Sequence, residues 1–350
     1  MYSPGRRFFL LLLTVSLVFI LRSCDTRFDF TLCFQSYPDL TQSEQFLKSL
    51  AQAYPQLARL SPIGFSVQGR AIWALEVGSN KHADREKPPG STKQSGREKP
   101  QLLFTSLIHA DEWISLPVVL YLAYQFVNTY ESDREIRYIV DNSSLWFVPV
   151  VNPDGYEYSR SKERGWRKNR ASCGGLSIGV DLNRNFDCMW NIEEGFSRDP
   201  NSPFYRGPKA SSEPETRALE ELAASISFKA AIDFHSFGQH ILYPYGYLRA
   251  SCADDELFKS VAATMAGALK AVNGSVYEPR QLSSIYSGGL PSGTLMDYLY
   301  GSHGTLAFTV ELAPRTKEQG GVQLAAEKII GVCKENFVLV KFLCGWIIEH

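Results

Sequence analysis

Hydrophobic and polar positions follow two different periodicities along the chain, and these predict strands and helices in alternation. Short apolar runs rich in β-branched and aromatic residues, bounded by turn residues, predict strands. Apolar residues that recur every three or four positions predict helices. We expect strands at 63–77 (a hairpin turning at 68–70), 101–108, 144–151, 229–233 and 305–312, and helices within 36–60, from 113, and over 212–224, 256–272 and 323–348. This alternation predicts one α/β domain with a central mixed, mostly parallel sheet flanked by helices.

Polar signals at the ends of these elements refine the prediction. Ser212-x-x-Glu215 is a capping-box pattern and predicts the start of a helix. Asn152-Pro153-Asp154-Gly155 follows an apolar strand and predicts a turn. The segment 81–100 is charged and rich in Pro and Gly, which predicts a solvated loop.

The N-terminal segment has the pattern of a targeting sequence. Arg6 and Arg7 precede fourteen residues without a charge, 8–21, a run too short to span a bilayer comfortably. We expect a signal peptide over 1–24 or a short anchor. Ser23-Cys24 resembles a lipoprotein cleavage site, so lipid on Cys24 is an alternative route to membrane attachment. Each interpretation predicts an exported protein.

Composition narrows the class of protein. A chain of 350 residues with 44% hydrophobic content can bury a large core. Its net charge of −1, without an extended basic stripe, argues against a nucleic-acid partner, and we expect a monomer. Seven cysteines are typical of an exported protein. We expect Cys173 to pair with Cys188, whereas Cys333 and Cys344 would lie about 16 Å apart along one helix, beyond disulfide reach.

His109 and Glu112 are the first candidates for chemistry. They stand where a strand gives way to a helix, at the mouth of the sheet where open α/β folds place their ligands. An imidazole and a carboxylate are two of the three protein ligands that a catalytic zinc needs. His-x-x-Glu alone also arises by chance, and a histidine at a strand end is often a core residue, so the remaining motifs decide.

Six motifs in order resemble the zinc carboxypeptidases of the carboxypeptidase A family. The resemblance covers about Gln35 to the C-terminus and implies a single catalytic domain over 35–350, with no inhibitory pro-domain and no C-terminal β-sandwich. The motifs are His109-x-x-Glu112, Trp166-Arg167-Lys168, Gly179-Val180-Asp181-x-Asn183-Arg184-Asn185, Phe234-His235-Ser236, Tyr243-Pro244-Tyr245-Gly246-Tyr247 and Phe308-Thr309-Val310-Glu311-Leu312.

The resemblance implies a metal site. His109, Glu112 and His235 would hold one Zn²⁺ per chain and leave a fourth position for water, the ligand set for which carboxypeptidase A is the standard example. Asp181 would orient His109 through a hydrogen bond. A loop cap is the alternative role for Asp181, and a core histidine the alternative for His235.

Catalytic and substrate-binding roles follow from the same resemblance. Glu311 would take a proton from the water and pass it to the departing amine. Arg167 would stabilise the oxyanion, although a surface charge is its alternative. Arg184, with Asn183, would bind the terminal carboxylate of a peptide or protein. Tyr286 resembles the family's mobile tyrosine that closes over substrate.

Departures from the family pattern bear on substrate choice. Asp111 stands where digestive members carry an arginine, and Phe237 replaces a tyrosine. Met296 stands where members that prefer basic ends carry an acid, so we expect an apolar or aromatic C-terminal side chain. The alternatives are a cell-wall peptidase that cuts D-glutamyl–diamino-acid links on the same zinc site, and an inactive peptide-binding module.

Overall fold

The protein is described here in a computed structural model that defines residues 28–79, 99–192 and 197–350. The predicted targeting segment 1–24, with Cys24, lies outside the described residues, and so does the predicted loop 81–100 except for Lys99 and Pro100. Within the described ranges, no helix combines the length and the apolar character needed to cross a bilayer.

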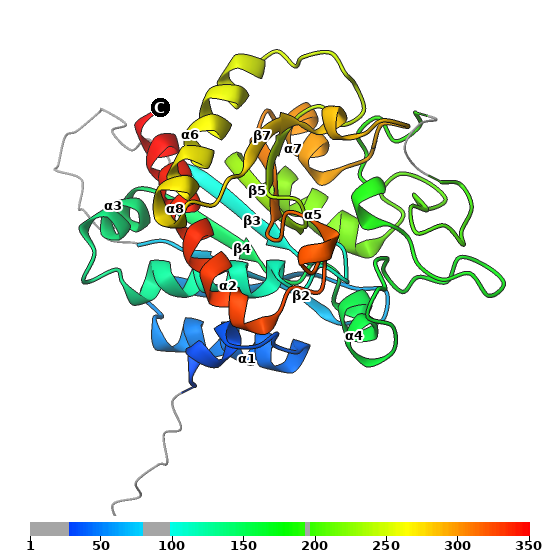
Figure 1. Ribbon diagram of the computed structural model, residues 1–350. Helices are drawn as coiled ribbons and strands as arrows, with labels where there is room; N and C mark the ends of the chain where they lie inside the picture. The colour runs from blue at the N-terminus through cyan, green and yellow to red at the C-terminus, as the bar shows by residue number, and fades with distance from the viewer. Residues whose placement is uncertain (1–27, 80–98, 193–196) are drawn as a thin grey trace, which may run out of the picture.

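A twisted sheet forms the centre of the molecule (Figure 1). Eight strands are found in the described chain, in the order β1-β2-β4-β3-β5-β8-β6-β7. Their neighbours are parallel in β3–β4, β3–β5, β5–β8 and β6–β7, and antiparallel in the other three pairs. The prediction of a mixed, mostly parallel sheet is therefore confirmed. The strands are β1 (Ala58–Phe65), β2 (Ala71–Val77), β3 (Gln101–Ser106), β4 (Ser144–Val148), β5 (Phe228–Ser236), β6 (His240–Tyr243), β7 (Glu278–Gln281) and β8 (Leu306–Leu312).

Helices cover both faces of this sheet. The apolar cluster on one face includes side chains from α1, α2, α3, α6 and α8, and the cluster on the other face includes side chains from α5 and α7. The α-helices of the described chain are α1 (Leu40–Ala53), α2 (Ser115–Asn128), α3 (Arg134–Asn142), α4 (Pro153–Ser161), α5 (Pro214–Ser225), α6 (Asp255–Asn273), α7 (Leu295–His303) and α8 (Ile329–Glu349). The strands β3, β4, β5 and β8 run in the same direction, so their carboxyl ends lie at one edge of the sheet.

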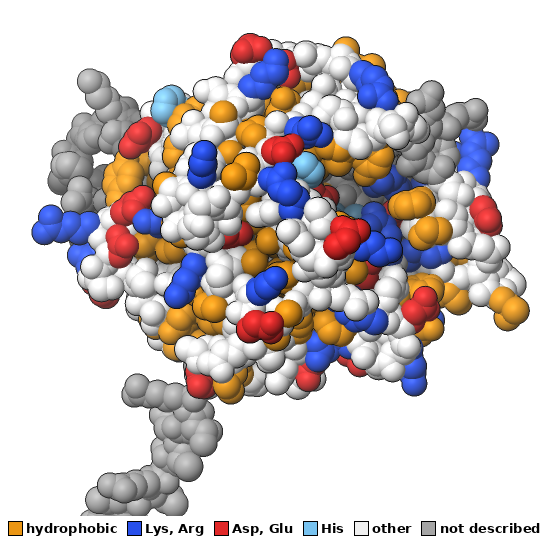
Figure 2. Space-filling model, viewed as in Figure 1, with side chains coloured by type: hydrophobic (Ala, Val, Ile, Leu, Met, Phe, Trp, Pro, Cys, Tyr) orange, Lys and Arg blue, Asp and Glu red, His pale blue; other side chains and the backbone are white. Residues whose placement is uncertain are grey.

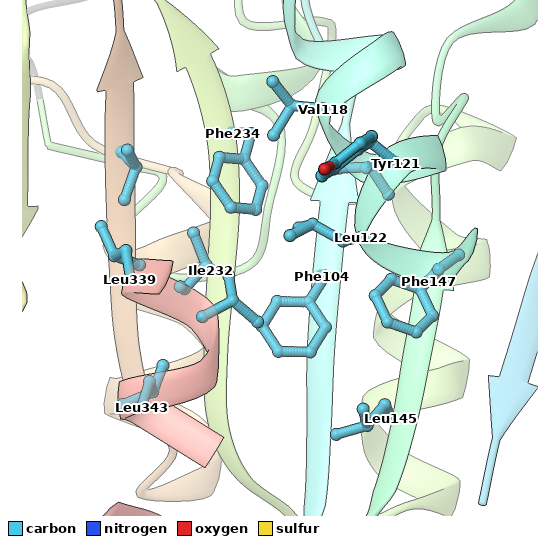
Figure 3. Packing of buried hydrophobic residues seen from close by; sticks show 14 of the residues in the cluster. Phe104, Val118, Tyr121, Leu122, Leu145, Phe147, Ile232, Phe234, Leu339 and Leu343 are labelled. Atoms are coloured by element: carbon cyan, nitrogen blue, oxygen red, sulfur yellow. The ribbon is translucent and has the colours of Figure 1, made fainter. Parts of the chain in front are cut away.

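The larger core explains why the central strands read as continuous apolar runs. Strands covered on both faces bury every side chain, so the period-two alternation disappears. Phe104 of β3 stacks on Phe147 of β4 with ring centroids 5.2 Å apart, and Leu122 of α2 lies over them (Figure 3). Leu339 of α8 packs in the same cluster. Burial of each such side chain stabilises the fold by about 1.5–3 kcal/mol.

Two predictions at element ends are wrong. Asn152 does not form a simple turn: it caps α4, accepting a hydrogen bond from the backbone N–H of Gly155 at 2.9 Å, and Pro153 occupies the first helical turn, where no N–H is required. The Ser212 capping box is not formed, because α5 begins at Pro214. Ser212 Oγ donates to Glu213 Oε1 instead.

The predicted disulfide is also wrong. All six cysteines in the described ranges carry free thiols. The Cys173 sulfur lies in a loop, 3.5 Å from the carbonyl oxygen of Gly179, whereas Cys188 is buried with its sulfur beside the position that a Cβ of Gly301 in α7 would take. The two side chains face different neighbours, so proximity in the sequence does not bring them together.

Candidate metal centre and active site

Three neighbouring strands position the candidate residues. β5 lies between β3 and β8. His109 follows the end of β3 by three residues, and Glu112 lies in the segment that leads into α2, which begins at Ser115, two residues later than predicted. His235 and Glu311 are direct partners across the parallel pair β5–β8. Because carboxyl ends of parallel strands share one edge, segments far apart in sequence meet there.

His109, Glu112 and His235 converge on a common point. The two Nδ1 atoms lie 3.0 Å apart, and Glu112 places Oε1 2.8 Å from His109 Nδ1 and Oε2 2.9 Å from His235 Nδ1. All three side chains are buried, and their ligand atoms lie within 4.8 Å of one another. The structure thus brings together two nitrogens and a carboxylate that could hold a metal ion.

Each imidazole also has a carboxylate on its other nitrogen. Nε2 of His109 lies 3.2 Å from Asp181 Oδ1, the partner that the sequence predicted. Nε2 of His235 lies 2.6 Å from Asp233 Oδ2. Asp233 was missed at the sequence level, although Asp-x-His on one strand places both side chains on one face. Histidine ligands of metals commonly have such a hydrogen-bond partner.

The electrostatic balance at this cluster keeps its carboxylates ionised. Burial alone would raise the pKa of Glu112, but the nearby His109 and His235 outweigh burial and hold that pKa well below its usual value. The pKa of Asp181 is also held low, since Arg167 and His109 outweigh its burial. Burial would lower the pKa of His235, yet Asp233 and Glu112 raise it well above its ordinary value. The ionised carboxylates of this cluster therefore favour a positive charge beside them.

Glu311 and Arg167 border the cluster. Glu311 is half-buried near the end of β8, and burial together with the charge of Glu112 raises its pKa to about 8. Arg167 has its Nε 3.2 Å from Asp181 Oδ2 and its Nη2 2.6 Å from His109 Nε2. Burial would lower the pKa of Arg167, but Asp181 and Glu112 outweigh burial and raise that pKa above its ordinary value. The guanidinium is therefore a permanent cation at the site.

The predicted substrate residues lie close by. Asn183 Oδ1 accepts from the backbone N–H of Leu295 at 2.9 Å, and its Nδ2 lies 3.3 Å from His235 Nε2. Arg184 is almost fully buried and donates from Nη1 to the carbonyl oxygen of Asn183 at 2.7 Å. The backbone of Gly293 packs closely against that of Arg184: its φ of +65° suits glycine, and a Cβ there would lie 2.5 Å from the Arg184 carbonyl oxygen.

Tyr286 and Met296 differ in how they face the site. Tyr286 is partly buried, and its backbone oxygen accepts from Arg249 Nη2 at 3.0 Å. Met296 is 1% exposed and packs in the apolar cluster with Leu295. Met296 follows Leu295, whose backbone N–H donates to Asn183. Met296 is therefore a core residue next to the site.

A hollow with basic and aromatic walls adjoins Arg167. It has a volume of about 420 Å³, and among its lining residues are Lys168, Arg170, Tyr158 and Trp166. The Arg170 guanidinium lies 3.6 Å from the centre of the Tyr158 ring. On the face shown in Figure 2, acidic and basic side chains are interspersed, and Lys and Arg gather right of centre. The basic and aromatic lining of the hollow suits a polar ligand.

This protein presents two histidines and a glutamate at the carboxyl ends of strands in an α/β sheet. That arrangement is typical of metal-dependent hydrolases. Comparison with known proteins specifies the family. A family model described as zinc carboxypeptidase matches residues 43–339. The chain therefore belongs to the zinc carboxypeptidase family: by this membership it is a metallocarboxypeptidase, a hydrolase that acts on peptide C-termini.

Relatives of known sequence and structure agree with this assignment. Carboxypeptidase B of Astacus astacus is 32% identical over 321 residues, which cover 89% of this chain and 97% of that protein. The inactive metallocarboxypeptidase ecm14 of Schizosaccharomyces pombe is 31% identical over 336 residues, which cover 91% of this chain and 64% of that protein. The crystal structure of thrombin activatable fibrinolysis inhibitor superposes with a TM-score of 0.83 at 27% identity, covering 94% of this chain and 79% of that one. The family resemblance and the fold predicted from sequence are thus confirmed.

Proposed function

We propose that this protein is a zinc-dependent carboxypeptidase that removes single residues from the C-termini of peptides and proteins. The convergence of His109, Glu112 and His235 within 4.8 Å supports this proposal most strongly. Two imidazoles and a carboxylate suit Zn²⁺ in chemical type, and three protein ligands leave a position for water. Both imidazoles have a carboxylate on the nitrogen that faces away from the cluster, as metal-binding histidines usually do.

Zinc bound there would act as a Lewis acid that polarises the scissile carbonyl and lowers the pKa of a water. Glu311 takes a proton from the attacking water and passes it to the departing amine. Its position supports this role, because it is paired with His235 across neighbouring strands and is only half-buried. A carboxylate at the edge of the metal cluster can reach both the water and the leaving group.

Arg167 stabilises the negative charge that develops on the scissile carbonyl oxygen. For His109 to bind metal through Nδ1, its Nε2 must carry the ring proton, and this N–H donates a hydrogen bond to Asp181. Nη2 of Arg167, now 2.6 Å from that nitrogen, could then no longer donate to it. The contact between Arg167 Nε and Asp181 can persist and hold the guanidinium at the cleft while Nη2 turns toward substrate.

Arg184 and Asn183 bind the terminal carboxylate of the substrate, since a guanidinium fork matches a carboxylate in geometry. Tyr286 closes over the C-terminal residue of the bound substrate. Met296 and the apolar cluster behind it favour an apolar or aromatic C-terminal side chain, because burial of such a side chain against them removes apolar surface from water. We also propose export through the segment 1–24 with cleavage near Cys24, which mass spectrometry of the secreted protein would test: an N-terminus near Cys24 supports cleavage, and an intact Met1 contradicts it.

The test is mass spectrometry of a peptide library incubated with the protein. We expect loss of one C-terminal residue, mostly apolar or aromatic, abolished by a zinc chelator and restored by Zn²⁺. His235→Ala should remove this activity, whereas His303→Ala, at an exposed histidine of α7, should not. Cleavage of cell-wall D-glutamyl–diamino-acid fragments in preference to peptides would instead favour the cell-wall peptidase. Peptide binding without cleavage, in the zinc-loaded protein, would favour an inactive module.

A further inference from the structure

His235 has a carboxylate beside each of its two ring nitrogens. Its Nδ1 faces Glu112, and its Nε2 lies 2.6 Å from Oδ2 of Asp233, which is 3% exposed. The amide nitrogen of Asn183 lies 3.3 Å from the same Nε2. One ring nitrogen cannot both donate to a carboxylate and accept from an amide. The shorter, charge-assisted contact decides that Nε2 carries the proton and donates to Asp233.

The backbone and a hydroxyl hold Asp233 in place. Thr105 of β3 and Asp233 of β5 are partners in the parallel pair, and Thr105 Oγ1 donates to Asp233 Oδ1 at 2.6 Å. Both carboxylate oxygens are therefore engaged, one by Thr105 and one by His235. A buried carboxylate is costly unless it is hydrogen-bonded, so this arrangement removes most of the penalty while it fixes the direction of the Asp233 side chain.

We propose that Asp233 is a positioning residue for the metal site: it locks His235 in the tautomer whose Nδ1 lone pair points at the ion, and Thr105 holds Asp233 in that orientation. This inference rests on the proposed zinc-dependent function and extends it to a second histidine. The site then has two carboxylate–imidazole pairs, Asp181 with His109 and Asp233 with His235. The added carboxylate makes the imidazole a more basic ligand and thus increases zinc affinity.

Zinc affinity, measured by competition with a chromophoric chelator on the full chain, tests this role. Asp233→Asn keeps the size of the side chain but removes its charge, and it should weaken zinc binding by about 10- to 100-fold. Thr105→Val keeps the carboxylate and removes only its anchor, and it should weaken binding less. Asp187→Asn, at an exposed aspartate, serves as the matched control and should leave the affinity unchanged.

Two further measurements separate a positioning role from general damage. The zinc-free Asp233→Asn protein should still unfold in one cooperative transition, at a lower melting temperature because buried His235 loses its charged partner, and its peptidase activity should return as zinc is added. The visible absorption spectrum of the cobalt-loaded variant should shift, because one ligand has changed orientation. Zinc affinity of both Asp233→Asn and Thr105→Val within twofold of the unmodified protein would overturn the inference alone. Absence of zinc binding by the unmodified protein would overturn the proposed function with it.

Discussion

Glu215, on the side of the fold reached by the β1–β2 hairpin, makes the stability of this protein depend on pH. It lies in the first turn of α5 with no exposed surface. Its Oε1 accepts from the backbone N–H of Val67 at 3.0 Å, and its Oε2 accepts from Asn169 Nδ2 at 3.2 Å. Burial raises the pKa of Glu215 from 4.5 to about 7, and the charge of the neighbouring Glu213 adds to the rise, against the hydrogen bonds that lower it.

The sign of the effect follows from the direction of that shift. The folded state binds the Glu215 proton more tightly than the unfolded state does, so this contribution to stability is complete below pH 4.5 and is lost as the pH rises through 7. Each unit of pKa difference corresponds to about 1.4 kcal/mol. Between pH 5 and pH 8 the loss from Glu215 alone should be about 2–3 kcal/mol of unfolding free energy. A neutral side chain should abolish it.

Urea denaturation of Glu215→Gln at pH 5, 6.5 and 8, followed by tryptophan fluorescence, measures this difference. We expect the variant to lose about 2–3 kcal/mol less than the unmodified protein between pH 5 and pH 8. Titration of the metal cluster is common to both proteins and cancels in the comparison. Glu221→Gln, at an exposed position of α5, should follow the unmodified protein. Parallel pH profiles for Glu215→Gln and the unmodified protein would refute the assignment of this pH dependence to Glu215.

Three further substitutions have definite expected outcomes. Arg184→Lys removes the planar fork proposed to bind the terminal carboxylate, so kcat/KM for peptides should fall by at least about tenfold, or roughly 1.4 kcal/mol of transition-state binding, while equal values would exclude that role. Met296→Asp should shift cleavage toward basic C-terminal residues in a library digest if Met296 forms the pocket floor; a lower melting temperature with unchanged preference would identify it as core only. Phe104→Ala should lower the unfolding free energy by about 3–5 kcal/mol in urea titrations, because it opens a cavity in the core between the sheet and the helices that include α2 and α8; a loss below about 1 kcal/mol would contradict this packing.

The sequence predicts most of the fold because the buried strands carry their signal locally. Leu102–Phe104 and Leu145–Phe147 are apolar at every position, as strands covered on both faces must be, and α2 repeats its apolar residues at helical spacing. The family motifs likewise bring His109, Glu112 and His235 into one hypothesis. These features depend on residue type and order, which a sequence displays directly.

Features that depend on register or on distant partners could not be predicted. The contact between Thr105 and Asp233 requires a specific pairing of β3 with β5, and residues between them supply no hint of that register. Glu215 was assigned to a capping box with Ser212 because both signals are local. The structure instead gives its carboxylate to the N–H of Val67, 148 residues away. Proximity in sequence misled in the same way for Cys173 and Cys188.

Contacts with neighbouring segments fix the backbone that follows β3 and leads to His109. Leu107 is buried with φ of +51°, a left-handed conformation that costs a leucine about 1–3 kcal/mol. The surroundings enforce it: the Leu107 carbonyl oxygen accepts from the N–H of Asn152 at 3.0 Å, and its N–H donates to Ser115 Oγ at 3.3 Å. The chain therefore bends between the end of β3 and His109, held by contacts with the segment after β4 and with α2. Because these contacts involve none of the three candidate ligands, the fold can hold His109 in position without a metal ion.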